Sequence, residues 1–228
     1  MLRAIIFDFD GVIVNSEPLK LKVIQQIAAK EGWSVTEAEY YRNCLPLGDH
    51  GIIEYLYRSH GQSVARARRD ELLDGKKRAY ARAIGAGLPA PPGAVDFVHQ
   101  AAARHTLAIA SGSLRSEIEH LLRKLELREA FAVLATADDS ERSKPDPEVY
   151  LQALVRLQQL PGFRQKPLSA AECLAIEDAP HGVLAAQKAG IRCLALSHSV
   201  PPEELRHADW VFRGFAEVDL ARLQAAFA

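Results

Sequence analysis

The sequence predicts a doubly wound, Rossmann-like α/β domain built on a parallel sheet, with a second, helical domain inserted into it. Three observations predict this fold. Short apolar runs that end in polar residues recur along the chain, helical patterns lie between them, and one long stretch contains helical patterns alone. An apolar run without polar alternation suits a strand covered on both faces, and alternating strands and helices are typical of a doubly wound sheet.

Three runs are predicted to be buried strands. Each is short and, apart from Arg3 in the first run, continuous and apolar, and each is followed at once by a polar residue. The runs cover residues 2–7, 107–110 and 174–176, and the polar residues that follow them are Asp8, Ser111, Glu177 and Asp178.

Local signals predict helices between these strands. Residues 115–127 place leucine and isoleucine at helical spacing. Asp146 before Pro147 is typical of an N-cap followed by a first-turn proline. Pro180 opens another helix, which Gly190 can end as a C-terminal glycine.

Residues 16–87 are predicted to form the inserted α-helical domain. No convincing buried strand occurs there, and the apolar residues fall at helical spacings. The stretch 86–93, rich in glycine and proline, marks the return to the first domain. Residues 1–15 and 88–228 are therefore expected to form the α/β core.

Composition excludes several classes of protein. The chain has 228 residues, of which 48% are hydrophobic and 25% charged, so it can bury a sizeable core. Lys plus Arg number 28 against 29 Asp plus Glu, and a net charge of −1 provides no general field for nucleic acid or an anionic membrane. No apolar run approaches the roughly 20 residues of a membrane span. We expect neither nucleic acid nor membrane as a partner.

The N-terminus and the cysteines indicate where the protein works. A charge follows only a few apolar residues, and no small-residue cleavage site is present, so no signal peptide is recognisable. Cys44, Cys173 and Cys193 are far apart and lack metal-ligand spacing, which favours reduced thiols in a reducing compartment. We expect a cytoplasmic protein and a monomer, although an oligomer is left open.

The chemistry is expected at the carboxyl edge of the sheet, where ligands bind in open parallel sheets. Several carboxylates brought to one edge would repel one another unless a cation lay among them. Oxygen ligands imply Mg²⁺, and no histidine or cysteine is placed to suggest zinc. The candidate residues are Asp8, Asp10, Ser111, Lys144, Glu177 and Asp178.

These residue types predict phosphoryl transfer. The Ser111 hydroxyl and the Lys144 ammonium suit the oxygens of a phosphoryl group, and the helix start after Ser111 adds backbone donors. Asp8, rigidly held at the strand end, fits a nucleophile that forms an aspartyl phosphate. Asp10, in the turn before Gly11, fits the acid that protonates the leaving oxygen and then the base that deprotonates water.

Four segments resemble the motifs of the haloacid dehalogenase-like hydrolase superfamily, in the same order. The resemblance covers essentially the whole chain. It implies a core of that type with an inserted helical cap, as in the branch that contains phosphoglycolate phosphatase and beta-phosphoglucomutase. The segments read DFDGVIVNSE (8–17), ASGS (110–113), SKPDP (143–147) and IEDAPHGVLAAQKAG (176–190).

The resemblance also implies an activity and residue roles. It implies a Mg²⁺-dependent phosphatase that hydrolyses small phosphate monoesters, such as sugar phosphates or phosphoglycolate-like acids, so a small phosphorylated metabolite is the expected partner. Asp8 would be nucleophile and metal ligand, and Asp10 acid/base and metal ligand through its carbonyl. Asp178 would bind the metal directly, with Glu177 helping through water. The phosphate-binding residues would be Ser111, Gly112 and Lys144.

Two other functions stay open. Beta-phosphoglucomutase has a histidine at the position of Lys20, and its absence weakens the phosphomutase alternative. A catalytically inactive phosphate-binding module is the second alternative, which the intact acidic residues and Lys144 argue against. Dehalogenation is disfavoured because the dehalogenases need no metal and lack the aspartate that stands here as Asp10.

Four residues of the insert are candidate determinants of substrate choice. Residues 58–82 contain eight basic side chains against three acidic ones, which is the usual composition of a solvated helix surface. The functional alternative is that one or two of them bind the anionic part of a substrate. Two interpretations of the loop 45–51 are equally open: it faces the active site, or it is an ordinary glycine-containing turn between helices. The four candidates are Lys20, Gly48, Lys76 and Lys77.

Overall fold

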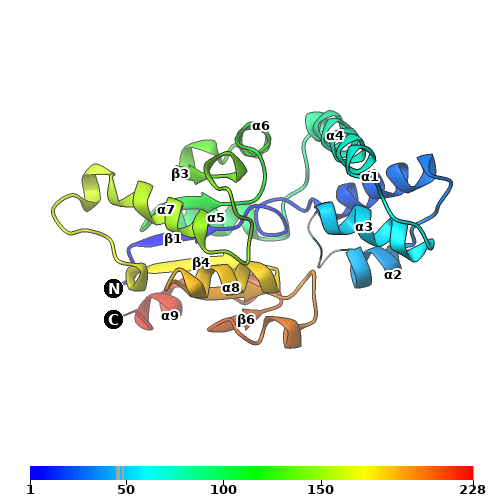
Figure 1. The fold of residues 1–228 in the computed structure, drawn as a ribbon. Helices are drawn as coiled ribbons and strands as arrows, with labels where there is room; N and C mark the ends of the chain where they lie inside the picture. Colours follow the sequence, from blue (N-terminus) through cyan, green and yellow to red (C-terminus); the bar gives the residue numbers. More distant parts are fainter. Residues whose placement is uncertain (45–46, 48, 228) are drawn as a thin grey trace. The chain divides into compact units, whose positions relative to one another are not determined.

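The chain forms two compact units in the computed structural model, which describes residues 1–44, 47 and 49–227. One unit consists of Met1–Asn15 and Gly87–Ala228, and we refer to it as the core unit. The other consists of Ser16–Ala86, and we refer to it as the helical unit (Figure 1). Each unit is described by itself.

A parallel sheet of six strands forms the centre of the core unit within the described residues. Its strand order is β3-β2-β1-β4-β5-β6, and every neighbouring pair is parallel. The order confirms the predicted doubly wound topology, with its switch point between β1 and β4. The strands are β1 (Ala4–Phe7), β2 (Thr106–Ala110), β3 (Phe131–Ala135), β4 (Cys173–Glu177), β5 (Arg192–Leu196) and β6 (Trp210–Phe212).

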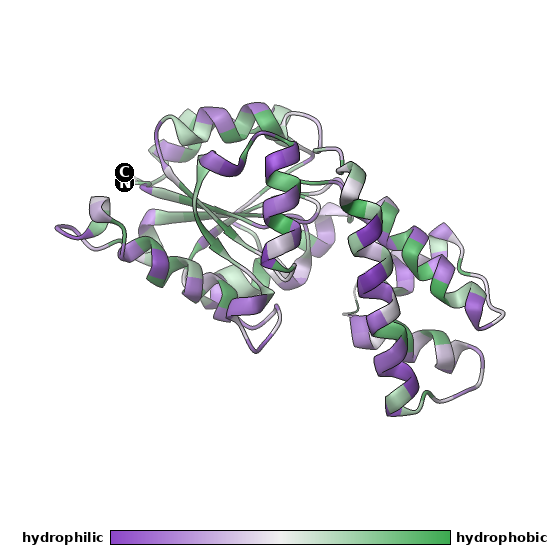
Figure 2. Cartoon of the chain, turned by 90° about the horizontal axis from the view of Figure 1, so that it is seen from above, coloured by the Kyte–Doolittle hydropathy of each residue, from purple (hydrophilic) through white to green (hydrophobic). Residues whose placement is uncertain are grey.

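Helices cover both faces of this sheet, and the strands form the hydrophobic layer between them (Figure 2). On one face, the Phe7 ring packs edge-on against Phe97 and Phe131, at centroid distances of 6.2 and 5.7 Å. On the other face, side chains of α7 and α8 bury Ala4 and Ile6. The helices are α5 (Ala94–Ala102), α6 (Arg115–Lys124), α7 (Glu148–Gln158), α8 (Pro180–Lys188) and α9 (Leu220–Ala225).

Short 3₁₀ helices make up much of the remaining connections. They are η2 (Ile84–Ala86), η3 (Arg128–Ala130), η4 (Ala137–Asp139), η5 (Pro161–Phe163), η6 (Ala170–Glu172), η7 (Pro202–Leu205) and η8 (Phe215–Glu217).

The helical unit has its own hydrophobic core. Ile24 and Ile27 of α1 pack with Ile53 and Leu56 of α3 and with Leu73 of α4. Among the described helices none has the length and hydrophobicity of a bilayer span, and the longest, α4, is rich in charged residues. The helices are α1 (Glu17–Lys30), α2 (Glu37–Glu39), the π-helical turn η1 (Tyr40–Cys44), α3 (Asp49–Ser59) and α4 (Arg66–Ala83).

Two helix boundaries differ from the prediction. The helix expected over residues 115–127 ends at Lys124, because Glu126 adopts a positive φ of 58° that ends it. The helix expected to include Pro147 in its first turn begins at Glu148. The N-cap is therefore Pro147 and not Asp146, although Asp146 Oδ1 accepts the N–H of Glu148 at 3.0 Å.

Asp139 joins the end of β3 to α7 through a dense set of charged hydrogen bonds. Arg156 donates to its Oδ1 at 2.6 Å, and Arg115 and the Thr136 backbone N–H donate to its Oδ2 at 2.7 and 2.9 Å. Burial opposes ionisation, but the hydrogen bonds from Arg156 and Thr136 and the charge of Arg115 lower the pKa of Asp139 to about 2. This side chain therefore stabilises the fold in its ionised form.

Replacing Asp139 with asparagine should lower the free energy of unfolding by about 1–3 kcal/mol at neutral pH, because the donors lose the negative charge and one of the two acceptor oxygens. The pKa of the native Asp139 lies below its ordinary value of 3.8, so its contribution is lost as pH falls from that value towards about 2. Urea unfolding of both proteins across this range, with Asp96→Asn as the control, checks the prediction. Equal stability at pH 7 would show that the network contributes nothing.

Candidate active site

Asp8 is held at the carboxyl edge of the sheet by the backbone on both sides of it. It follows β1 directly, and its N–H donates to the Ile176 carbonyl of β4 at 2.8 Å. The turn that follows depends on Gly11, which has a φ of +81°. A Cβ at Gly11 would also overlap the carboxylate of Asp178. The local sequence therefore fixes the position of Asp8 and lets Asp178 approach closely.

Lys144 connects the polar ends of three strands. Its Nζ donates to Asp8 Oδ1 at 2.7 Å, to Glu177 Oε1 at 2.6 Å and to the Ala110 carbonyl at 3.0 Å. Its side chain is only 8% exposed. One buried ammonium thus lies between two carboxylates that come from β1 and β4.

Glu177 and Asp178 complete an acidic cluster with Asp8. All three are buried, and one carboxylate oxygen from each lies within 4.8 Å of the others. Gly182 in the first turn of α8 is needed here, because a Cβ at that position would overlap the carboxyl group of Glu177. The backbone of α8 therefore packs directly against one of the three acids.

The charges of this cluster are strongly coupled. Burial raises the pKa of Asp8 to about 6; Lys144 opposes the shift, and the negative charges of Glu177 and Asp10 add to it. Burial alone would lower the pKa of Lys144, but Asp8 and Glu177 raise it above its ordinary value. Lys144 therefore stays protonated, and Asp8 is mostly ionised at neutral pH.

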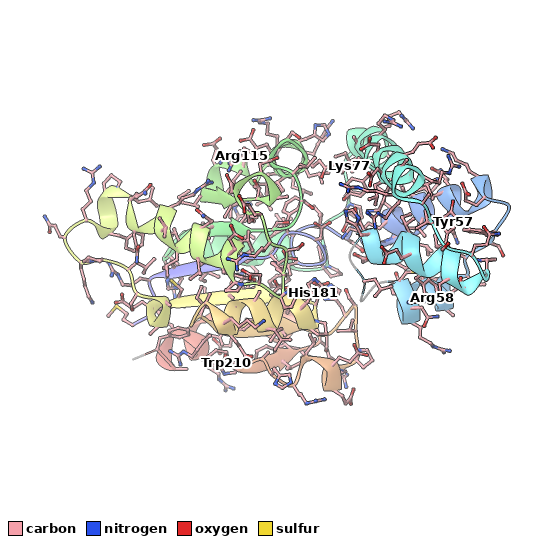
Figure 3. The ribbon with its side chains drawn as sticks, in the orientation of Figure 1. Tyr57, Arg58, Lys77, Arg115, His181 and Trp210 are labelled. Atoms are coloured by element: carbon pink, nitrogen blue, oxygen red, sulfur yellow. The ribbon has the colours of Figure 1, made fainter. Side chains whose placement is uncertain are left out.

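The cluster fits a hard divalent cation. Carboxylate oxygens are the ligands that Mg²⁺ prefers, and a cation among them would offset the repulsion that a single lysine leaves uncompensated. The donor set of Asp8, Glu177 and Asp178 contains no nitrogen or sulfur. His181 lies in the first turn of α8 (Figure 3) and is not one of the grouped residues.

The remaining core residues of the predicted site lie at the same edge. Ser111 is buried directly after β2, and its Oγ accepts the N–H of Ser113 at 3.0 Å. The Ser113 hydroxyl donates to Asp10 Oδ2 at 2.5 Å, which ties the acid/base candidate to the segment after β2. An added Cβ at Gly112 would meet no described atom within 4 Å, so this part of the edge is open. The side chain of Asp10 lies outside the acidic cluster, and its carbonyl as a metal ligand stays a prediction.

Sequence reasoning did not select two polar residues of this edge. Ser113 contacts Asp10, which lies 103 positions away in the chain. Tyr150 of α7 is fully buried, and its hydroxyl donates to Glu177 Oε1 at 2.7 Å. Ser113 lies within one of the recognised motifs, which is a signal that could have found it. Tyr150 matches the pattern of an ordinary core position of a helix, so the sequence gives no such signal for it.

The candidates in the helical unit have local partners. Lys20 donates to Glu17 at 2.9 Å, and Lys76 donates to Asp49 at 2.6 Å. Lys77 is exposed on α4 (Figure 3), and Gly48 lies outside the described residues. Their roles in substrate choice stay predictions. Half of the eight basic residues in 58–82 form ion pairs, namely Arg66, Arg68, Arg69 and Lys76.

Comparison with known proteins places this site in a family. The profile of the family described as haloacid dehalogenase-like hydrolase matches residues 5–196. Validoxylamine A 7'-phosphate phosphatase of Streptomyces hygroscopicus subsp. limoneus is 31% identical over 96% of this chain and 96% of its own length. The phosphorylated carbohydrates phosphatase of Thermotoga maritima is 31% identical over 87% of this chain and 87% of its own.

A solved structure supports the same assignment. The crystal structure of a CbbY variant from Rhodobacter sphaeroides in complex with xylulose-(1,5)bisphosphate has a TM-score of 0.80 to this chain, with 27% sequence identity. The match covers 97% of this chain and 98% of that one. The motifs, the fold and these matches agree, and the chain belongs to the haloacid dehalogenase-like hydrolase family.

Proposed function

We propose that this protein is a Mg²⁺-dependent phosphatase that hydrolyses small phosphate monoesters through an aspartyl phosphate on Asp8. The observation that carries the proposal is the buried Asp8 carboxylate, which shares Lys144 with Glu177 and forms an acidic cluster with Glu177 and Asp178. Such a cluster suits phosphoryl transfer, in which positioning and charge compensation supply most of the catalysis. The relatives named as phosphatases support the same activity.

The first half-reaction transfers the phosphoryl group to the protein. A carboxylate oxygen of Asp8 attacks phosphorus, a phosphorus–oxygen bond forms, and the bond to the ester oxygen breaks. Asp10 gives its proton to the departing oxygen, so that a neutral alcohol leaves. Ser111, Gly112 and Lys144 are proposed to hold the phosphoryl oxygens, the first two from the segment after β2.

The second half-reaction restores the carboxylate. Asp10, now ionised, takes a proton from water as the water oxygen attacks phosphorus, and the bond between phosphorus and Asp8 breaks to release inorganic phosphate. Asp8, Glu177 and Asp178, with the Asp10 carbonyl, would hold Mg²⁺. When bound, the ion supplies positive charge that lets an anionic nucleophile approach an anionic phosphate.

We propose phosphorylated sugars or similar polyols as the substrate class. The relatives act on validoxylamine A 7'-phosphate and phosphorylated carbohydrates according to their names, and CbbY was crystallised with a sugar bisphosphate. Residues of the helical unit, Lys20, Gly48, Lys76 and Lys77, are proposed to select among such substrates. The three cysteines are free and buried, which supports a reducing, cytoplasmic location.

The test is phosphate release from a panel of small phosphate monoesters, with Mg²⁺ and with EDTA. We expect release that depends on the metal, is highest for sugar phosphates and returns when Mg²⁺ is added back in excess. Full activity in EDTA after extensive dialysis would contradict the metal requirement. Conversion of a hexose phosphate to its isomer, dependent on a bisphosphate primer and without phosphate release, would identify a phosphomutase instead.

A further inference from the structure

A tyrosine outside the four motifs gives the two oxygens of Glu177 different surroundings. The Tyr150 hydroxyl donates to Oε1 at 2.7 Å, and Lys144 Nζ donates to the same oxygen at 2.6 Å. Oε2 accepts the weaker N–H of Asp178 at 3.2 Å. Oε1 therefore already has two strong donors, while Oε2 has capacity for a further partner.

Tyr150 is also well placed to fix this arrangement. Its side chain is fully buried in α7, packed in the core on one face of the sheet. Lys144 Nζ lies 5.0 Å from the centroid of its ring, so the same residue contacts both members of the buried ion pair. Glu177 itself is 1% exposed, and Gly182 packs against its carboxyl group. The carboxylate is thus held by protein groups and not by solvent.

We infer that Tyr150 is a positioning residue that fixes the orientation of the Glu177 carboxylate, so that Oε2 faces the cation of the acidic cluster. The inference rests on the proposed Mg²⁺ site and assigns Tyr150 a role that its sequence position does not reveal. Without the hydroxyl, Lys144 remains as a donor to Oε1, but one donor restricts rotation of a carboxylate less than two. Partners of this kind typically contribute 10–100-fold to metal affinity.

The test is binding of the metal alone to Tyr150→Phe, which keeps the buried ring and removes only the hydroxyl. Mn²⁺ binding is followed by electron paramagnetic resonance, with Mg²⁺ as competitor and no substrate present. We expect both dissociation constants to rise by about 10-fold or more. Tyr57→Phe is the matched control, because its hydroxyl donates to Glu31 at the same distance of 2.7 Å but lies in the helical unit. Its metal affinity should equal that of the wild type.

A double-mutant cycle separates positioning from a general loss of structure. If Tyr150 acts through Glu177, removing its hydroxyl should leave metal affinity unchanged in a Glu177→Ala background, which removes the acceptor of the Tyr150 hydrogen bond. An equal loss of affinity in both backgrounds would overturn the inference, as would unchanged affinity in Tyr150→Phe.

These outcomes also distinguish the inference from the proposed function. A wild-type protein that binds metal and releases phosphate, beside a Tyr150→Phe protein with unaltered affinity, overturns only the role of Tyr150. A wild-type protein that releases phosphate but binds neither Mn²⁺ nor Mg²⁺ overturns the metal site, and the inference with it.

Discussion

Replacing Asp8 with asparagine is expected to reduce phosphate release by at least about 10⁴-fold while the protein stays folded. The amide group of asparagine is a poor nucleophile and cannot form the aspartyl phosphate. The asparagine side chain has nearly the same shape as that of Asp8, and the backbone N–H at this position can still donate to Ile176 in β4. Lys144 keeps Glu177 as its partner, so the buried ammonium is not left unpaired.

Two measurements check the role of Asp8. Phosphate release under saturating Mg²⁺ gives the rate, and circular dichroism with thermal unfolding establishes that the variant is folded. Mass spectrometry after acid quench should find the phosphoryl group on the peptide that contains Asp8 in the wild type and nowhere in the variant. Asp96→Asn is the control; Asp96 is exposed on helix α5, and this variant should keep the wild-type rate. A folded Asp8→Asn protein with comparable activity would refute the nucleophile assignment.

The sequence predicted strands β1, β2 and β4 and missed β3, β5 and β6. The strand β5 was missed although it is buried between β4 and β6, whereas the two edge strands were missed for a physical reason. The strands β1, β2 and β4 are continuous apolar runs, because neighbours cover them on both sides and both faces, and each ends in residues that carry chemistry. At one edge, β3 is the five-residue run FAVLA, which by composition suits a helix as well. At the other edge, β6 has three residues and is only half-buried. Such strands are specified mainly by their neighbours.

The residues of the candidate site also fall into two groups, those that the sequence predicts and those that it does not. Asp8 and Asp178 could be predicted because they closely follow predicted strands, and Lys144 because it lies in a recognised motif before the Asp146 helix. The hydrogen bond between Ser113 and Asp10, like the one between Tyr150 and Glu177, joins residues that are distant in the chain and that only the packed fold brings together. Residue pairs of this kind leave no periodicity or spacing in a single sequence.

Replacing Lys144 with methionine is the second change with a large expected effect. Methionine keeps most of the length of the side chain and removes its charge, so Asp8 and Glu177 lose the ammonium that both contact. We expect the rate at saturating Mg²⁺ to fall by about 10²–10³-fold, the usual cost of removing one preorganised donor from a phosphoryl or oxyanion site. In metal-free protein the free energy of unfolding should fall by about 3–5 kcal/mol, because buried carboxylates are left uncompensated.

The pH dependence of the rate and stability of the Lys144→Met protein is a more specific test of the Lys144 charge. Lys144 lowers the pKa of Asp8 against the effect of burial, so its removal should raise that pKa above the value of about 6 that Asp8 has in the metal-free wild type. Since the nucleophile must be ionised, the acidic limb of the pH–rate profile should move to higher pH. The raised pKa also means that the folded state of the variant binds its proton more tightly than the unfolded state. In metal-free protein, its stability deficit relative to the wild type should therefore grow as pH rises from about 6 towards the higher pKa of the variant, and shrink as pH falls.

The Lys188→Met variant is the control for how much of the effect of Lys144→Met comes from anchoring the loop that contains Lys144 and Pro145. Lys188 of α8 donates to the carbonyl of Pro145, the neighbour of Lys144, at 3.0 Å, but contacts none of the acids in the hydrogen bonds described. It should change stability slightly and leave the position of the pH–rate profile unaltered. If Lys144→Met shows the same profile as Lys188→Met, the lysine only anchors its loop. If only Lys144→Met shifts the acidic limb, the effect comes from the charge that Lys144 places beside Asp8.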